Sequence, residues 1–155
     1  MVFPITENSE THRKEEREQL ESANTEVSKD VFYMKQFAKN ACGTVALYHV
    51  LGNLPEEHKG LIAEGSVLDK FYKETKDKTP KERGDYFKDS KEVQESHVEA
   101  VEEGETEVEE TVDHHFVAFV NVKGELYELD GRKYNAINHG KTSEDSFLQD
   151  SCKEA

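Results

Sequence analysis

Residues 35–44 read Lys35-Gln36-Phe37-Ala38-Lys39-Asn40-Ala41-Cys42-Gly43-Thr44. Asn40 is of a type preferred at helix N-caps. The run Val45–Leu51 that follows is apolar on nearly every face, which predicts a buried helix. Gly52 and Pro55 are expected to end it. Cys42 therefore lies in the first turn of a buried helix.

The position of Cys42 suggests a reactive thiol. Unpaired N–H groups and the positive end of the helix dipole favour a thiolate at a helix start. The thiolate is the nucleophilic form of cysteine. Gly43 would leave room for a substrate backbone to come close. From these residues alone, an inert core cysteine remains the alternative to the nucleophile of a cysteine protease.

Composition bounds the other possibilities. The chain of 155 residues is long enough for one domain, and its 34 acidic and 20 basic residues give a net charge of −14. Hydrophobic residues make up 34%, a low share that indicates long solvated segments, an incomplete core, or both. The acidic balance disfavours nucleic acid and suits a basic partner.

The sequence shows no sign of a membrane span, a secretory signal or a metal motif. No apolar run is long enough to cross a bilayer, and no basic-then-apolar leader is present, so we expect a cytoplasmic protein without a membrane partner. Cys42 and Cys152 do not form a disulfide framework. Metal-binding and phosphate-binding motifs are missing, so neither a cofactor nor a metal is expected.

The flanking segments are predicted from caps and apolar spacing. Val2–Ile5 is expected to end a strand, and residues 6–30 to form a solvated helix or linker. Helices are predicted from Ser66, from Thr79-Pro80 through about Lys88, and from Ser143.

The segment 92–113 is the most biased part of the chain. It holds ten carboxylates and no Lys or Arg, and its apolar residues are limited to valine and alanine. Such a segment cannot bury enough surface to offset its ordering entropy. We expect a long mobile loop, and the residues alone leave open plain disorder or an active-site lid.

A hairpin is predicted after this loop. Phe116–Val122 is a near-continuous apolar strand, Lys123-Gly124 a two-residue turn and Glu125–Leu129 the return strand. With Val122 opposite Glu125, the register places His115 opposite Arg132.

That register brings two candidate site residues together. His115 and Asp130 become diagonal neighbours on one face, within reach of a carboxylate–imidazole hydrogen bond, while His114 points to the opposite face. Cys42, His115 and Asp130 would then be nucleophile, base and orienting carboxylate.

The residues resemble a known family. The blocks Val31-Phe32-Tyr33-Met34-Lys35-Gln36 and Asn40-Ala41-Cys42-Gly43-Thr44 are similar to the active-site region of the ubiquitin carboxyl-terminal hydrolase (UCH) family. His115–Val120, Glu125–Arg132, Ile137–Gly140 and Phe3–Glu7 continue the likeness. It covers nearly the whole chain and is greatest to the small single-domain members.

The resemblance implies a role for each matching residue. Cys42 would be the nucleophile, His115 the general base and then acid, Asp130 the residue that orients His115, and Gln36 an oxyanion-hole donor. The segment at about 92–113 would be the family's crossover loop, which limits the size of the leaving group. His49, His97, His114 and His139 are expected to be structural or surface residues.

The resemblance also implies a fold and a reaction. We expect an α+β fold of the papain-like cysteine protease class, with a central antiparallel sheet surrounded by helices. The reaction would be hydrolysis of small adducts or peptide and isopeptide bonds at the C-terminal glycine of ubiquitin or a ubiquitin-like modifier, through a thioester on Cys42. The acidic balance complements the arginines of the ubiquitin tail.

The family's opening helices and closing strand have no counterpart here, so residues 1–155 are expected to form a single partial catalytic domain that is monomeric, with an incomplete sheet. Two other hypotheses follow from this departure. The chain could be a non-catalytic ubiquitin-binding fragment or isoform, or an acidic, largely disordered interaction protein.

Overall fold

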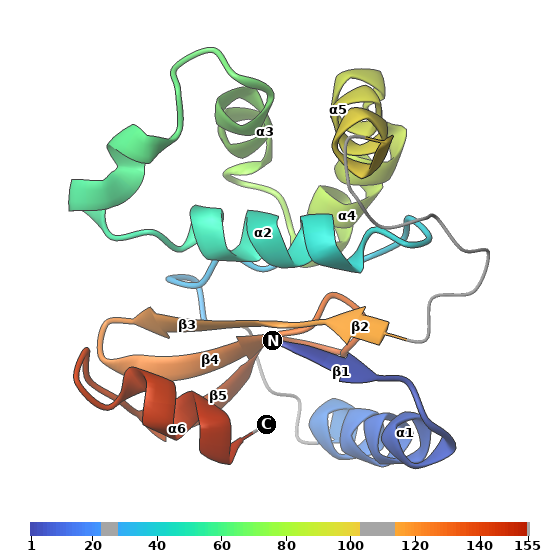
Figure 1. The fold of residues 1–155 in the computed structure, drawn as a ribbon, viewed down its shortest axis with the longest axis vertical. Coiled ribbons are helices and arrows are strands. Elements are labelled where there is room, and N and C mark those ends of the chain that lie inside the picture. The colour runs from blue at the N-terminus through green and yellow to red at the C-terminus, as the bar shows by residue number, and fades with distance from the viewer. Residues whose placement is uncertain (23–27, 103–113, 155) are drawn as a thin grey trace.

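The computed structural model describes residues 1–22, 28–102 and 114–154. Helix α2 (Cys42–Gly52) occupies the middle of the molecule, between a layer of helices and the strands (Figure 1). The helical layer consists of α3 (Val67–Thr75), α4 (Pro80–Asp89) and α5 (Lys91–Glu102). Helices α1 (Glu7–Ser22) and α6 (Phe147–Lys153) lie on the other side of the strands.

The strands form two antiparallel groups. Strand β1 (Val2–Pro4) pairs with β2 (His114–Phe116), while β3 (Ala118–Val122), β4 (Glu125–Leu129) and β5 (Ile137–Lys141) form a three-stranded sheet in that order. The expected hairpin register is present, because Val122 faces Glu125 around the Lys123-Gly124 turn. Both turn residues have positive φ, as a tight two-residue hairpin requires.

The predicted strand is nevertheless interrupted. Val117 lies outside both strands and donates its N–H to Met1 O, and His115 pairs with Phe3 of β1 instead of Arg132. The prediction of one continuous strand buried on both faces was therefore wrong, since Phe116 is 44% exposed. The pairing of β1 with β2 joins segments too far apart in sequence for a turn to indicate it.

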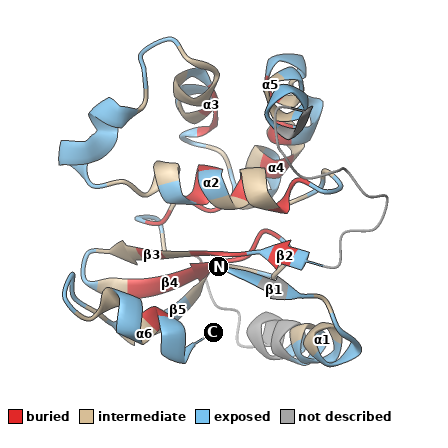
Figure 2. Cartoon of the chain, viewed as in Figure 1, coloured by how far each residue is buried: buried red, intermediate tan, exposed pale blue. Residues whose placement is uncertain are grey.

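The buried side chains form two clusters, one on each face of α2. Figure 2 shows buried residues on α2 itself, on the strands and on the helical layer. The first lies against the sheet and includes Tyr33, Val120 and Leu129. The second lies among the helices and includes Tyr48, Phe71 and Phe87, whose rings meet edge to face with centroids 4.8–6.3 Å apart. A helix that is apolar on nearly every face therefore has a core on both sides, as its sequence predicts.

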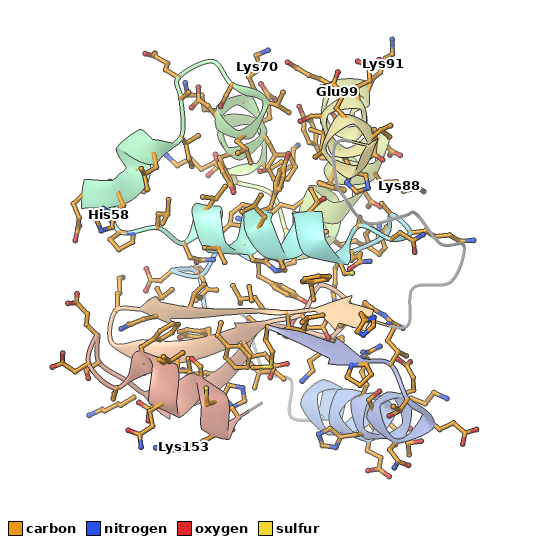
Figure 3. All side chains as sticks on the ribbon, viewed as in Figure 1. His58, Lys70, Lys88, Lys91, Glu99 and Lys153 are labelled. Carbon is orange, nitrogen blue, oxygen red and sulfur yellow. The ribbon has the colours of Figure 1, made fainter. Side chains whose placement is uncertain are left out.

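The outer surfaces carry the charge. Lys70, Lys91 and Glu99 extend from the outer faces of the helical layer, and Lys153 extends from α6 (Figure 3). Capping fixes the beginnings of two of these helices as predicted. Ser66 Oγ accepts from Asp69 N before α3, and Thr79 and Glu82 form a capping box around Pro80 at the start of α4.

Two predicted caps are wrong. Ala41, not Asn40, precedes α2 without a side-chain cap, and Asn40 instead has a φ of +54°, a conformation that asparagine tolerates better than most residues. The last helix begins at Phe147, and Ser143 instead forms a turn by accepting from Ser146 N.

The acidic segment is a helix in its described part. Residues 91–102 form α5, and only 103–113 of the predicted loop lie outside the described residues. Val93 is 3% exposed and packs with Phe87, and Gln94 donates to Phe87 O. These contacts order a segment whose charge predicted a mobile loop.

The N-terminal segment forms the elements that its sequence predicts. The predicted N-terminal strand corresponds to β1, and α1 forms within the segment expected to be a solvated helix or linker. Among the described residues, no helix is long and apolar enough to cross a membrane.

Candidate active site

Cys42 is the first residue of α2 and is 8% exposed. Because its N–H belongs to the first turn, it has no partner four residues earlier within the helix. Burial raises the pKa of the thiol. Hydrogen bonds from the His115 ring and from the backbone of Phe116 and Gly43 outweigh burial, so the pKa lies below that of an ordinary cysteine.

His115 and Asp130 lie in hydrogen-bond contact beside this thiol. His115 Nε2 is 2.7 Å from Asp130 Oδ1, and both side chains are almost fully buried. Burial lowers the pKa of His115, but the hydrogen bonds to Asp130 and Cys42 together raise it above the ordinary histidine value. With Nε2 engaged by Asp130, Nδ1 is the ring nitrogen left to face Cys42. The contact predicted between His115 and Asp130 is present, although the backbone pairing predicted for His115 is not.

Asp130 is held as a carboxylate. Burial raises its pKa, yet hydrogen bonds from His115 and the Arg132 N–H, with the charge of Arg13, bring it below the usual value. Oδ1 accepts both of those hydrogen bonds, the second at 2.9 Å. Oδ2 is buried without a hydrogen-bond partner among the described residues, and Arg13 Nε lies 3.9 Å from it.

A backbone hydrogen bond holds Gln36 beside the site. Its N–H donates to Gly131 O at 2.9 Å, which ties the segment before Cys42 to the residue after Asp130. A Cβ on Gly131 would lie 2.9 Å from Gln36 Cβ and 3.0 Å from a methyl of Val45, so only glycine allows this approach. The Gln36 amide donates to Ala38 O at 3.3 Å, and its second N–H remains for another acceptor.

Three of the four candidate site residues line one cavity. Its volume is about 450 Å³, and Gln36, Cys42 and His115 line it together with Phe116 and Arg132. A thiol of lowered pKa, an imidazole of raised pKa and an amide donor thus share one water-accessible space. That arrangement suits attack on a carbonyl carbon by sulfur.

Two further histidines border the cavity. His97 of α5 lies 2.8 Å from Thr44 Oγ1 through its Nδ1, and burial lowers its pKa. His114 lines the cavity as well. No sequence signal indicated His97, because the helix that carries it was expected to be a loop.

His49 and His139 lie outside the cavity lining. His49 is fully buried, with Nδ1 3.2 Å from Leu129 O and Nε2 3.2 Å from the Met34 N–H, so it links the segments that lead to Asp130 and Gln36. His139 lies between Glu128 and Glu154, 3.0 Å from each. Among the described residues, no group of three or more acidic, histidine or cysteine side chains could hold a metal ion.

Comparison with known proteins gives matches along the whole chain. The model of the family described as ubiquitin carboxyl-terminal hydrolase, family 1, matches residues 1–155. The chain is 41% identical over 153 residues to ubiquitin carboxyl-terminal hydrolase isozyme L1 of Rattus norvegicus, covering 99% of this chain and 67% of the relative. It is 40% identical to ubiquitin carboxyl-terminal hydrolase 3 of Arabidopsis thaliana, covering 98% and 63%.

Solved structures show the same fold. The catalytic domain of Trichinella spiralis UCH37, bound to ubiquitin vinyl methyl ester, superposes with a TM-score of 0.67 at 23% identity, covering 99% of this chain and 64% of that one. A second structure of the Trichinella protein gives 0.64 at 26% identity, covering 83% and 51%. The predicted α+β fold of the papain-like class is confirmed. The chain spans about two thirds of the length of the relatives that it matches.

Proposed function

Because the chain belongs to family 1 of the ubiquitin carboxyl-terminal hydrolases, we propose that it hydrolyses the bond that follows the C-terminal glycine of ubiquitin or a closely similar modifier. The observation that carries the proposal is the contact chain from Cys42 to His115 to Asp130, of which Cys42 and His115 line one cavity. The solved relative is a complex with ubiquitin vinyl methyl ester, which favours ubiquitin as the partner.

The first half of the reaction forms a thioester. The Cys42 thiolate attacks the glycine carbonyl carbon, and the carbonyl electrons move onto oxygen. The second N–H of the Gln36 amide and the Cys42 N–H would be the donors that hold that oxyanion. Collapse of the intermediate breaks the bond to the leaving group, which takes a proton from the His115 imidazolium.

The second half releases the product. His115 removes a proton from water, the hydroxide adds to the thioester carbonyl, and the C–S bond breaks to regenerate the Cys42 thiolate. Asp130 keeps the imidazole in one tautomer through both halves, since its Oδ1 accepts from Nε2. The raised pKa of His115 and the lowered pKa of Cys42 favour the imidazolium–thiolate pair from which the cycle begins.

The test is a reaction of the 155-residue chain with ubiquitin that bears an electrophile at its C-terminus, read by intact mass. We expect a single adduct on Cys42, lost in Cys42→Ala and kept in Cys152→Ala, because Cys152 is the exposed free cysteine of α6. Hydrolysis of a ubiquitin C-terminal ester should follow the same pattern. Ester hydrolysis that survives Cys42→Ala would refute the proposal.

A second outcome separates catalysis from binding. A chain that unfolds cooperatively and binds ubiquitin in calorimetry, yet forms no adduct, would be the non-catalytic ubiquitin-binding form. Cooperative unfolding also decides against a largely disordered interaction protein. The cytoplasmic location, the monomeric state and the single-domain boundary at 1–155 stay predictions.

A further inference from the structure

A second cavity borders the Cys42 cavity at its Gln36 end. Its volume is about 470 Å³, and it shares Gln36, Phe37 and Arg132 with the first. Lys35, Lys81, Lys133 and Tyr134 are among its other lining residues. We call this second cavity the Phe37 groove. The groove has four cationic lining residues and, among the described residues, no carboxylate, although the whole chain has a net charge of −14.

The walls of the groove combine exposed aromatic rings with ammonium groups. Phe37 is 43% exposed and Tyr134 is 36% exposed. Lys81 Nζ lies 5.8 Å from the Phe37 ring centroid, and Lys35 Nζ lies 5.3 Å from the Tyr134 ring centroid. A peptide in the groove would therefore meet apolar surface for its backbone and positive charge for its side chains.

The lysines and Arg132 differ in how far their charge is already engaged. Lys133 pairs at 2.8 Å with Glu128, and both side chains are mostly buried. The charge of Lys133 is therefore neutralised within the protein and contributes little to binding in the groove. Lys35 donates to the carbonyl groups of Lys133 and Tyr134. Lys81 pairs with Asp85, but 73% of the Lys81 side chain is exposed, and exposed pairs of this kind are weak.

Among the described residues, the ion-pair partner of Arg132 is Glu10, at a longer distance. Its guanidinium lies 3.4 Å from Glu10, and about a third of each side chain is exposed. The positive charge that a ligand in the groove would meet thus comes mainly from Lys35, Lys81 and Arg132.

The charge of the Phe37 groove also indicates the direction of a bound chain. Its positive lining repels the arginines of a ubiquitin tail. A chain that crosses Cys42 therefore has its leaving-group side at the basic end.

We propose, resting on the function proposed above, that the Phe37 groove binds the segment on the leaving-group side of the scissile bond and favours acidic residues there. The preferred substrates would be ubiquitin adducts whose first residues after the scissile bond carry carboxylates. Lys81 and Arg132 would hold those carboxylates, and the Phe37 ring would support the backbone between them. Exposed charge contacts of this kind support a preference of about twofold to fivefold for each acidic residue.

The test compares ubiquitin fusions that differ only after the scissile bond, with an acidic Glu-Glu, a neutral Gln-Gln or a basic Lys-Lys start to peptides of equal length. For the unaltered chain we expect kcat/KM to fall in the order Glu, Gln, Lys, with about a tenfold span at low salt that shrinks as salt rises. In Lys81→Glu the acidic preference should be lost or reversed.

The matched control is Lys73→Glu. Lys73 pairs with Asp69 on α3 as Lys81 pairs with Asp85 on α4, both four residues apart, and the Lys73 side chain is 63% exposed. Lys73 does not line the groove. It therefore reproduces the change of charge and of helix pairing without the change in the groove, and its preference should match that of the unaltered chain.

Two further measurements distinguish a failure of the proposed function from a failure of the inference about the groove. The C-terminal electrophile has no leaving-group peptide, so its rate with Cys42 should be the same in Lys73→Glu as in the unaltered chain, and no adduct with either would mean that the proposed function fails. Dissociation constants of the same fusions with Cys42→Ala should follow the order Glu, Gln, Lys even if cleavage is slow. Equal values for the three fusions, or an acidic preference that Lys81→Glu retains, would overturn the inference while leaving the proposed function standing.

Discussion

Arg13→Gln tests how the buried Asp130 carboxylate is stabilised. Arg13 Nε lies 3.9 Å from Oδ2, which accepts no hydrogen bond from the described residues, and only 12% of the Arg13 side chain is exposed. Glu10 holds the guanidinium in place at 2.7 Å. The substitution removes the positive charge and keeps a polar side chain of similar length.

The magnitude follows from the distance. Two unit charges 3.9 Å apart attract by about 4 kcal/mol at an effective dielectric constant of about 20. Asp130 keeps its hydrogen bonds from His115 and the Arg132 N–H, so part of its charge stays compensated. We therefore expect the free energy of unfolding to fall by about 2 kcal/mol at pH 7, below the ~3–5 kcal/mol typical of an isolated buried charge.

The sign of the pH dependence is fixed by the direction of the shift. The pKa of Asp130 is lowered in the folded state, so its contribution to stability is present above the unfolded pKa and is lost as pH falls through the folded pKa. Without Arg13 the folded pKa rises toward the unfolded value, so the contribution is smaller and its loss is complete at a higher pH. The acidic limb of kcat/KM should move in the same direction, because a protonated Asp130 no longer holds His115 as an acceptor.

The assays are urea unfolding at several pH values and the pH profile of ubiquitin C-terminal ester hydrolysis. Lys14→Gln is the control, since Lys14 is an exposed neighbour on the same helix. At neutral pH the activity should fall by less than about tenfold, since loss of an orienting carboxylate costs about 10⁴-fold. An Arg13→Gln profile that superposes on that of the unaltered chain, with unfolding free energies equal within about 0.5 kcal/mol, would refute the reasoning.

Three further changes follow from close packing and burial. Gly84→Ala places a Cβ 2.2 Å from Lys35 O, so the backbone must move, and we expect a loss of more than about 2 kcal/mol in urea unfolding. Gly131→Ala pushes on Gln36 Cβ at 2.9 Å, so kcat of ester hydrolysis should fall by about tenfold or more while calorimetric ubiquitin binding persists; unchanged kcat would contradict this placement of Gln36. Burial lowers the pKa of His49 to about 4, so stability is full above pH 6.5 and declines as pH falls toward 4. This shift accounts for about 3 kcal/mol of acid sensitivity, which urea unfolding should find absent in His49→Phe.

The local features of the fold could be predicted because each depends on neighbouring residues. The Thr79-Pro80-Lys81-Glu82 capping box and the Lys123-Gly124 hairpin follow from turn and cap chemistry, and both are present. The long-range features could not be predicted in the same way. The sequence of strand β5 lacks the alternating apolar residues that would indicate a strand. The pairing of Phe3 with His115 joins residues far apart in the sequence, which no turn or cap motif connects.

The acidic segments show a second reason for failure. Charge predicted a solvated helix or linker where α1 forms, and mobility for residues 92–102, which are instead ordered in α5. Neither prediction indicated the contact that each helix makes near the site. Arg13 approaches Asp130 from α1, and His97 approaches Thr44 from α5. A single side chain on a charged helix leaves composition unchanged, so a pattern-based argument misses it.

The predicted contact between His115 and Asp130 nevertheless forms, and the reason lies in hydrogen bonds that hold the neighbouring segments together. Tyr33 Oη donates to Asp130 O, His49 links Met34 to Leu129, and Gln36 N donates to Gly131 O. These bonds join three segments: the one before Cys42, helix α2, and the end of β4. None of them passes through the β1–β2 pair, so Gln36, Cys42 and Asp130 keep their relative positions independently of how the His115 strand is paired. His115 then needs only to emerge near the end of the hairpin for its ring to reach Asp130, which is why an incorrect strand pairing still led to the correct contact.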